Sequence, residues 1–202
     1  MITCKRIKDY LDENYPFTET LSSLSNNPLI NSQEVVYDFD RIKNTIYPSC
    51  CSADVLFIKK HINLIEFKTG FGGADESKSD KLKKENQVLK IKLKATDSLR
   101  LLDVCIIDEI KKIDNDTLDG RIQKTYCAVI DTDKSLFASD EMLTDIISEA
   151  GNVHNTDSYK TRIENSLKTY RKQTDHYNRL FFNEISVMYD FEFDQKMSNH
   201  FK

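Results

Sequence analysis

The sequence predicts an α/β fold in which a mixed central β-sheet is flanked by helices. Short apolar runs rich in β-branched and aromatic residues alternate with stretches whose apolar residues recur every three or four positions. The first pattern is typical of buried strands and the second of amphipathic helices. Their mixed order, without an internal repeat or a linker, predicts one domain over residues 1–202, a length that can bury a substantial core.

The composition is that of a soluble globular protein. Hydrophobic residues make up 39% of the chain and charged residues 31%, and no apolar run approaches the ~20 residues that cross a bilayer. The N-terminus has no apolar core of the signal-peptide kind, so we expect a cytoplasmic protein that makes no membrane contact. The 5 Cys show no metal-binding spacing and predict free thiols. Because the formal net charge is -4, any nucleic-acid contact requires a local basic patch.

The N-terminal quarter predicts a helix, a loop and one ambiguous segment. Ile7, Tyr10 and Leu11 have helical spacing and predict a short first helix. Residues 20–33 are rich in Ser and Asn and predict a connecting loop. Residues 34–48 fit both a strand and a helix, because a two-residue alternation overlaps with a helical period there.

Residues 51–70, CSADVLFIKKHINLIEFKTG, predict a β-hairpin. Two apolar, β-rich runs at 55–58 and 62–67 flank the polar residues 59–61, which predicts antiparallel strands joined by a tight turn. Three glycines follow within the polar residues 70–80 and predict a flexible loop.

The segment 80–112 predicts one long helix. Its LKIKLKA stretch alternates like a strand, but apolar residues spaced by three and four continue from Val88 to Ile113 and cover far more of the segment. Two further strands are predicted at 125–133 and 179–189. The remaining predicted helices span residues 139–151, 158–177 and 190–201.

The hairpin brings two carboxylates together at the sheet's edge. With the turn centred near Lys60, Asp54 faces Glu66 across the ladder, with Cβ atoms roughly 5 Å apart. The two-residue period of a strand places Lys68 on the face of Glu66, while Phe67 points to the other face. Like charges at this distance repel, and carboxylate oxygens suit Mg²⁺ or Mn²⁺. We therefore hypothesise a divalent metal site; the alternative is a hairpin whose ends are charged without binding a metal.

A metal ion at this place would favour phosphodiester hydrolysis. It would polarise a phosphate oxygen and lower the pKa of a water molecule, while Lys68 orients that water or neutralises charge on the phosphate. Glu-x-Lys occurs three times, starting at Glu66, Glu76 and Glu109, so the tripeptide alone means little. Only the first copy ends an apolar strand and has an acid at the start of the preceding strand.

Asp54 followed by IEFKTG resembles the signature of the PD-(D/E)XK nuclease superfamily. The similarity is close at the motif and looser over residues 34–131. It implies a restriction-endonuclease-like core of a helix, three strands, a helix and a strand. It also implies that Asp54 and Glu66 bind the metal ion together with the backbone carbonyl of Phe67. Lys68 would then assist the attacking water.

One position departs from the superfamily pattern and another is left open. Ala53 stands where many members carry Pro before the first acid. Many members also carry an early acidic residue on the first helix. The sequence leaves four candidates for that residue, namely Glu13, Glu34, Asp38 and Asp40.

A local excess of positive charge predicts a face that contacts phosphate. Between Lys78 and Lys94 there are seven Lys against two acids. The predicted nucleic-acid contacts are Lys81, Lys83, Lys84, Lys90 and Lys94. The alternative is a solvated helix face. A second basic run, within residues 160–179, is interleaved with Tyr, which suits either base stacking or helix packing.

We therefore expect a Mg²⁺- or Mn²⁺-dependent endonuclease that hydrolyses phosphodiester bonds, with DNA favoured over RNA as the substrate. Many nucleases cut two strands with two copies, so a homodimer is compatible with this expectation. The alternative is a catalytically inactive domain of the same fold that binds nucleic acid or a protein partner in bacterial defence or phage counter-defence. Residue identity does not separate the two.

Overall fold

A six-stranded mixed sheet lies at the centre of the fold, in the order β1-β2-β3-β4-β5-β6. The computed structural model describes residues 1–69, 71, 78–131, 160–169 and 182–200. The strands are β1 (Thr18–Thr20), β2 (Val35–Asp38), β3 (Val55–Ile58), β4 (Ile62–Lys68), β5 (Lys124–Ile130) and β6 (Glu184–Tyr189). Strands β1 to β4 pair antiparallel, whereas β4, β5 and β6 are mutually parallel.

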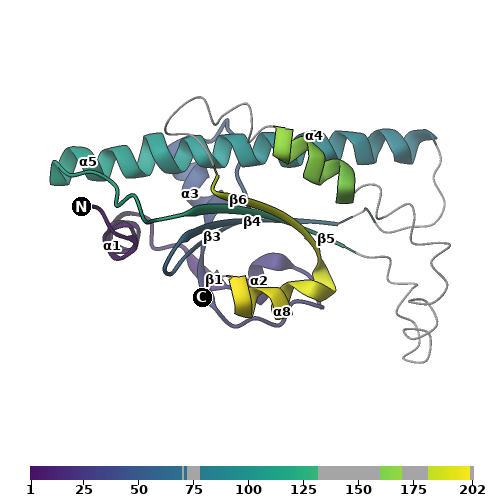
Figure 1. The fold of residues 1–202 in the computed structure, drawn as a ribbon, viewed down its shortest axis with the longest axis horizontal. Helices are drawn as coiled ribbons and strands as arrows, with labels where there is room; N and C mark the ends of the chain where they lie inside the picture. Colours follow the sequence, from purple (N-terminus) through teal and green to yellow (C-terminus); the bar gives the residue numbers. More distant parts are fainter. Residues whose placement is uncertain (70, 72–77, 132–159, 170–181, 201–202) are drawn as a thin grey trace.

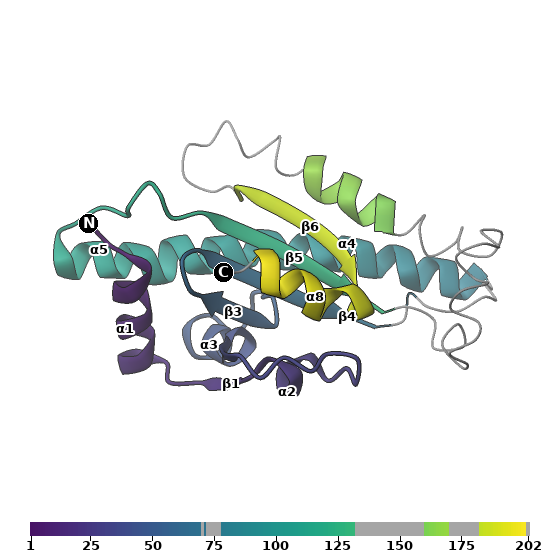
Figure 2. The same cartoon turned by 60° about the horizontal axis from the view of Figure 1, so that its bottom comes forward.

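Helices cover both faces of this sheet (Figure 1). A long rod runs along one face, with the helix at residues 160–169 beside it, while α2 and α8 lie on the opposite face, as Figure 2 also shows. The rod consists of α4 (Lys78–Arg100), the π-helix η1 (Leu101–Ile107) and α5 (Asp108–Asp114). The other labelled helices are α1 (Cys4–Asn14), α2 (Leu21–Ser25), α3 (Phe39–Ile46) and α8 (Asp190–His200).

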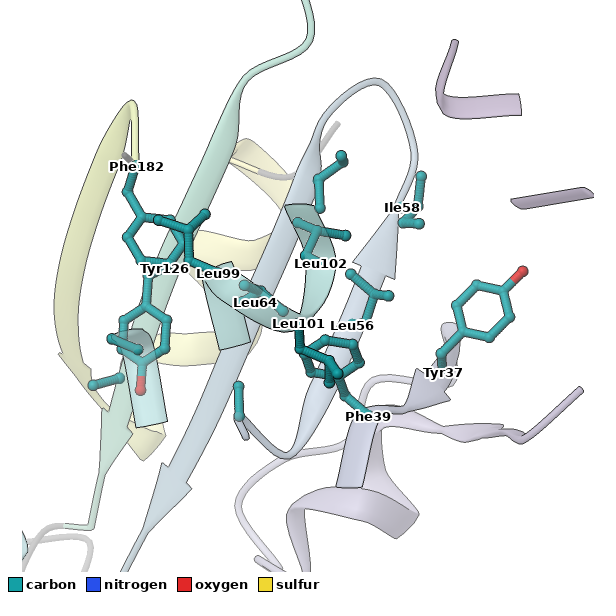
Figure 3. Packing of buried hydrophobic residues seen from close by; sticks show 14 of the residues in the cluster. Tyr37, Phe39, Leu56, Ile58, Leu64, Leu99, Leu101, Leu102, Tyr126 and Phe182 are labelled. Carbon is teal, nitrogen blue, oxygen red and sulfur yellow. The ribbon is translucent and has the colours of Figure 1, made fainter. Parts of the chain in front are cut away.

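Alternation along the strands divides the hydrophobic core between these two faces. Val55 and Phe57 belong to the cluster under α2 and α8, whereas Leu56 and Ile58 belong to the larger cluster under the rod. Figure 3 shows members of the larger cluster, among them Tyr37, Phe39, Leu64, Leu102 and Tyr126. Because both faces are covered, β3 is buried along its whole length, and its sequence VLFI is a continuous apolar run rather than an alternation.

The structure confirms the predicted α/β fold, the hairpin of β3 and β4, and the long helix. It also confirms the predicted later strands as β5 and β6 and the last helix as α8. Residues 160–169 are helical within the helix predicted at 158–177, and the helix predicted at 139–151 lies outside the described residues. None of the described helices combines the length and apolar character needed to cross a bilayer.

Two N-terminal segments differ from the prediction. The ambiguous residues 34–48 contain both expected structures, β2 followed directly by α3, which is why the two periods overlap there. The predicted loop at 20–33 begins with the short helix α2, preceded by β1. The Thr20 side chain accepts a hydrogen bond from the Ser23 N–H and caps α2. Ser and Thr form similar side-chain hydrogen bonds to the backbone in loops, so their presence does not distinguish a helix cap from a loop.

A buried ion pair ties the rod to the sheet. Both carboxylate oxygens of Asp103, in η1, accept hydrogen bonds from Lys124 Nζ at the start of β5, at 2.6 and 2.8 Å. Each residue is 8% exposed. Burial raises the pKa of Asp103 although Lys124 opposes that shift. Each charge therefore compensates the other in a buried place where either one alone would be strongly destabilising.

We predict that Lys124→Met lowers the free energy of unfolding by about 3–5 kcal/mol, because it leaves a buried carboxylate without its cation. Replacing both residues, as Asp103→Leu with Lys124→Met, should restore much of that loss. Urea denaturation measures both variants. Lys112→Met, which removes an exposed ammonium from α5, is the control and should leave the midpoint unchanged. Equal stability of the single and double variants would contradict this account.

Candidate functional site

The predicted site residues converge where β3 begins and β4 ends. Val55 pairs with Ile65, so Asp54, one residue before β3, lies beside Glu66 of β4. This register agrees with the predicted turn. Strand alternation turns Glu66 toward the face that α4 covers, where Lys94 projects from the helix.

Four charged groups make direct contact in this cluster. Lys94 Nζ lies 2.9 Å from Asp54 Oδ1 and 2.9 Å from Glu66 Oε2. Lys68 Nζ lies 3.0 Å from Glu66 Oε1. We call Asp54, Glu66, Lys68 and Lys94 the carboxylate–lysine cluster. Two negative and two positive groups make it neutral when all four are ionised.

The cluster is more buried than a site at the sheet's edge would be. Strand β4 lies between β3 and β5, and Glu66 is 0% exposed, whereas the side chains of Lys94, Lys68 and Asp54 are 17%, 23% and 23% exposed. Solvent thus reaches the cluster from the side of the lysines and Asp54. Glu66 forms its closed inner end.

Burial controls the protonation of Glu66. Loss of solvation, followed by the nearby negative charge of Asp54, raises the pKa of Glu66 to about 7, although Lys94 and Lys68 oppose this shift. Burial alone would lower the pKa of Lys94, but Glu66 and then Asp54 outweigh it and raise that pKa above its ordinary value. The lysine therefore stays charged, and Glu66 is poised to gain or lose a proton near neutral pH.

The oxygen atoms of the cluster fit a hard divalent cation. Glu66 Oε1 is buried and accepts no hydrogen bond of good geometry from any described residue, although Lys68 Nζ is close. Asp54 is fixed in place because its Oδ2 accepts a hydrogen bond from the Phe67 N–H at 2.7 Å. Asp54, Glu66 and the Phe67 carbonyl would supply the oxygen ligands that Mg²⁺ or Mn²⁺ prefers.

A third acidic ligand is not found in the described part of the chain, where no three His, Cys, Asp or Glu residues group to hold a metal. The four early acids have other places. Asp38 caps α3 by accepting from the Arg41 N–H, Asp40 accepts from the Ser52 hydroxyl, and Glu34 pairs with Lys59. Glu13 lies exposed near the end of α1. None of the four joins Asp54 and Glu66.

The loop before β3 is held by α4, and this hold positions Asp54. The Ala53 N–H donates to Ser98 Oγ at 2.6 Å, and the Cys51 N–H donates to Asp97 Oδ2 at 3.0 Å. Ala53 and Ser98 are both fully buried. A Pro at position 53 has no N–H and would lose the bond to Ser98. The Ala53 N–H therefore ties the loop to α4, which a Pro at this position could not do.

The predicted nucleic-acid contacts on α4 fall into three groups. Lys83 and Lys90 are exposed, and the side chains of Lys81 and Lys84 lie outside the described part of the structure. Lys94 instead turns inward to the two carboxylates. A signal for this was present, because Lys94 lies three residues after Ile91 and four before Ser98, on the helical face that carries buried residues.

No sequence pattern singled out Gln87, which also lies near the site. It precedes Lys94 by seven residues and therefore shares its helical face. Its Nε2 donates to the Thr69 carbonyl, just after β4, at 3.4 Å, while its buried Oε1 accepts no hydrogen bond from a described residue.

The second basic run is largely neutralised where the structure describes it. Lys160 pairs with Glu192, Arg162 with Glu85 and Lys168 with Glu164. Its tyrosines, at positions 159, 170 and 177, lie outside the described residues. These ion pairs favour a packing role for the helix at residues 160–169.

The comparisons with known proteins provide no relative. No family model matches the chain, and neither the curated proteins nor the solved structures contain a significant match. The functional argument for this chain therefore depends on the geometry of the carboxylate–lysine cluster.

We predict that Ser98→Ala lowers the free energy of unfolding by about 1–3 kcal/mol, because the buried Ala53 N–H loses its acceptor. Thermal or urea denaturation measures the change. Thr96→Ala is the matched control, since it removes a hydroxyl of the same helix that donates to the local Lys92 carbonyl. If the two variants lose the same stability, Ser98 does not hold the loop.

The raised pKa of Glu66 predicts a pH-dependent stability. Between the ordinary pKa of 4.5 and about 7, folded Glu66 keeps a proton that the unfolded chain has released. Its contribution is therefore complete below pH 4.5 and is lost as the pH rises through 7. Glu66→Gln should remove a decline of roughly 3 kcal/mol in unfolding free energy between about pH 5 and pH 8. Parallel pH profiles for the two proteins, measured by urea denaturation, would contradict the raised pKa.

Proposed function

We propose that this chain is a metal-dependent nuclease of restriction-endonuclease-like fold that hydrolyses phosphodiester bonds, with DNA preferred to RNA. One observation carries the proposal. Asp54 and Glu66 lie side by side where β3 begins and β4 ends, Lys94 contacts both of them, and Lys68 contacts Glu66. Two acids and an amine are the groups that such a reaction needs at one place.

The chain topology supports the same fold. After helix α1, strands β2, β3 and β4 form an antiparallel unit, and α4 then crosses over the sheet to the parallel strand β5. Apart from β1 and α2, which precede β2, and α3, which separates β2 from β3, this order matches the helix, three strands, helix and strand that the resemblance to the PD-(D/E)XK superfamily implies. Strands β1 and β6 extend the sheet on either side.

The residues of the site have separate tasks in this proposal. Asp54, held by the Phe67 N–H, and Glu66 present oxygen atoms from a rigid hairpin, together with the Phe67 carbonyl. A bound Mg²⁺ or Mn²⁺ would supply Lewis-acid polarisation of a phosphate oxygen and a water of lowered pKa. Lys68, partly exposed beside Glu66, orients the attacking water or neutralises charge on the phosphate. Exposed Lys83 and Lys90 lie on the helix that carries Lys94 and offer phosphate contacts.

One feature favours a second candidate, a catalytically inactive domain of the same fold that binds nucleic acid or a protein partner. Lys94 already bridges both carboxylates and, together with Lys68, balances their charge, and the described residues provide no third acidic ligand. A cluster balanced in this way is stable without a metal ion. The two candidates differ in a property that is directly measurable, which is cleavage.

We predict Mn²⁺- or Mg²⁺-dependent cleavage of DNA, and a loss of roughly a hundredfold or more in Glu66→Ala and in Lys68→Ala. The substrates are linear and circular double-stranded DNA, single-stranded DNA and single-stranded RNA, followed on gels. Lys112→Ala, on the exposed side of α5, is purified in parallel and should retain full cleavage. Circular dichroism of each variant checks folding.

Two results would contradict the proposed nuclease activity. Cleavage that persists at the same rate in both site variants would come from another protein in the preparation. Absence of cleavage for every substrate, with folded wild-type protein and either metal, would favour the inactive binding domain.

A further inference from the structure

The Lys94 ammonium occupies the place between the two carboxylates. Its Nζ is 2.9 Å from an oxygen of Asp54 and 2.9 Å from an oxygen of Glu66. It therefore bridges the two carboxylates. Lys68 contacts Glu66 through the other oxygen, Oε1. The two lysines of the cluster are therefore not equivalent.

We propose that Lys94 is an internal counterion that competes with a divalent cation for Asp54 and Glu66. The metal ion enters only when Lys94 Nζ leaves. This inference rests on the proposed function, because it concerns the same metal site. It assigns to Lys94 a regulatory role at the carboxylates in place of the direct phosphate contact predicted from the basic run.

Distance and charge disfavour simultaneous binding in this arrangement. A Mg²⁺ ion requires oxygen ligands at about 2.0–2.1 Å, and a cation held by both carboxylates would lie near an ammonium that is 2.9 Å from one oxygen of each carboxylate. Like charges a few Å apart repel strongly in a poorly solvated place, and Glu66 is 0% exposed.

The charge of the cluster leads to the same conclusion. Two carboxylates and two ammonium groups sum to zero, so a divalent ion added without a rearrangement would leave an excess of two positive charges. Departure of Lys94 lowers that excess to one. Lys68 can remain, because it contacts a single carboxylate and its side chain is 23% accessible, against 17% for Lys94.

Lys94 has a route out of the cluster. Its side chain is 17% exposed, so part of it already borders solvent. A lysine side chain has four rotatable bonds and a strongly hydrated head group, which allows it to swing outward while α4 stays in place. The neighbouring Leu93 is 48% exposed and Lys90 is also exposed, so solvent borders the helix there.

The test is the affinity of the chain for Mn²⁺ alone, measured by isothermal titration calorimetry and by the electron paramagnetic resonance signal of free Mn²⁺. We expect Lys94→Met to bind Mn²⁺ roughly tenfold tighter or more than the wild type, since its competitor is gone. Lys94→Arg keeps a cation and should not show the gain. Lys90→Met removes an exposed positive charge one turn away and controls for the general change in net charge.

A double variant, Lys94→Met with Glu66→Gln, shows whether the measured ion occupies the cluster, and it should lose the tight binding. Lys94→Gln replaces Lys94→Met if the latter does not fold by circular dichroism.

The outcomes separate this inference from the function on which it rests. Equal Mn²⁺ affinities in the wild type and Lys94→Met, at a site that Glu66→Gln abolishes, would overturn the competition and leave the metal site intact. The same gain in Lys90→Met would also overturn it, because bulk charge would then explain the effect. Absence of Mn²⁺ binding in the folded Lys94→Met protein would reject the metal site itself, and the competition with it.

Discussion

Burial of the Glu66 carboxylate is the constraint on which the site depends. A fully buried acid has to be protonated or accompanied by cations, and this chain provides two lysines at hydrogen-bonding distance. Most positions in a protein core hold an apolar residue, which packs there without needing a cation or a hydrogen-bond partner. Retention of an acid, with a second acid beside it, costs stability and is therefore more readily explained by chemistry than by packing.

The rod formed by α4, η1 and α5 connects that constraint to the rest of the fold. One side of α4 packs on the sheet, and the same helix supplies Lys94 to the carboxylates and Ser98 to the loop that carries Asp54. Farther along, η1 is anchored to β5 through the buried pair of Asp103 and Lys124. A displacement of the rod would therefore alter the cluster and the core together, which makes the geometry of the site as rigid as the packing.

The elements that could be predicted are those with strong local patterns. The hairpin followed from two apolar runs around a polar turn, and its register placed Asp54 next to Glu66 because strand pairing advances by one residue on each side. The secondary structure of residues 34–48 could not be predicted, since β2 passes into α3 without an intervening turn and the strand and helix periods overlap. The helix α2 was missed because its capping Thr20 and its serines are equally common in loops.

The sequence by itself determined the α/β class, the hairpin register and the acids and Lys68 that share one strand face, because these follow from periods of two and 3.6 residues along a local segment. Only the tertiary structure decided that Lys94 bridges the two carboxylates, that Ser98 receives the Ala53 N–H, and that no early acid joins the cluster among the described residues. These contacts join residues that are far apart in the chain. Their distances depend on how α4 crosses the sheet, which no local period specifies.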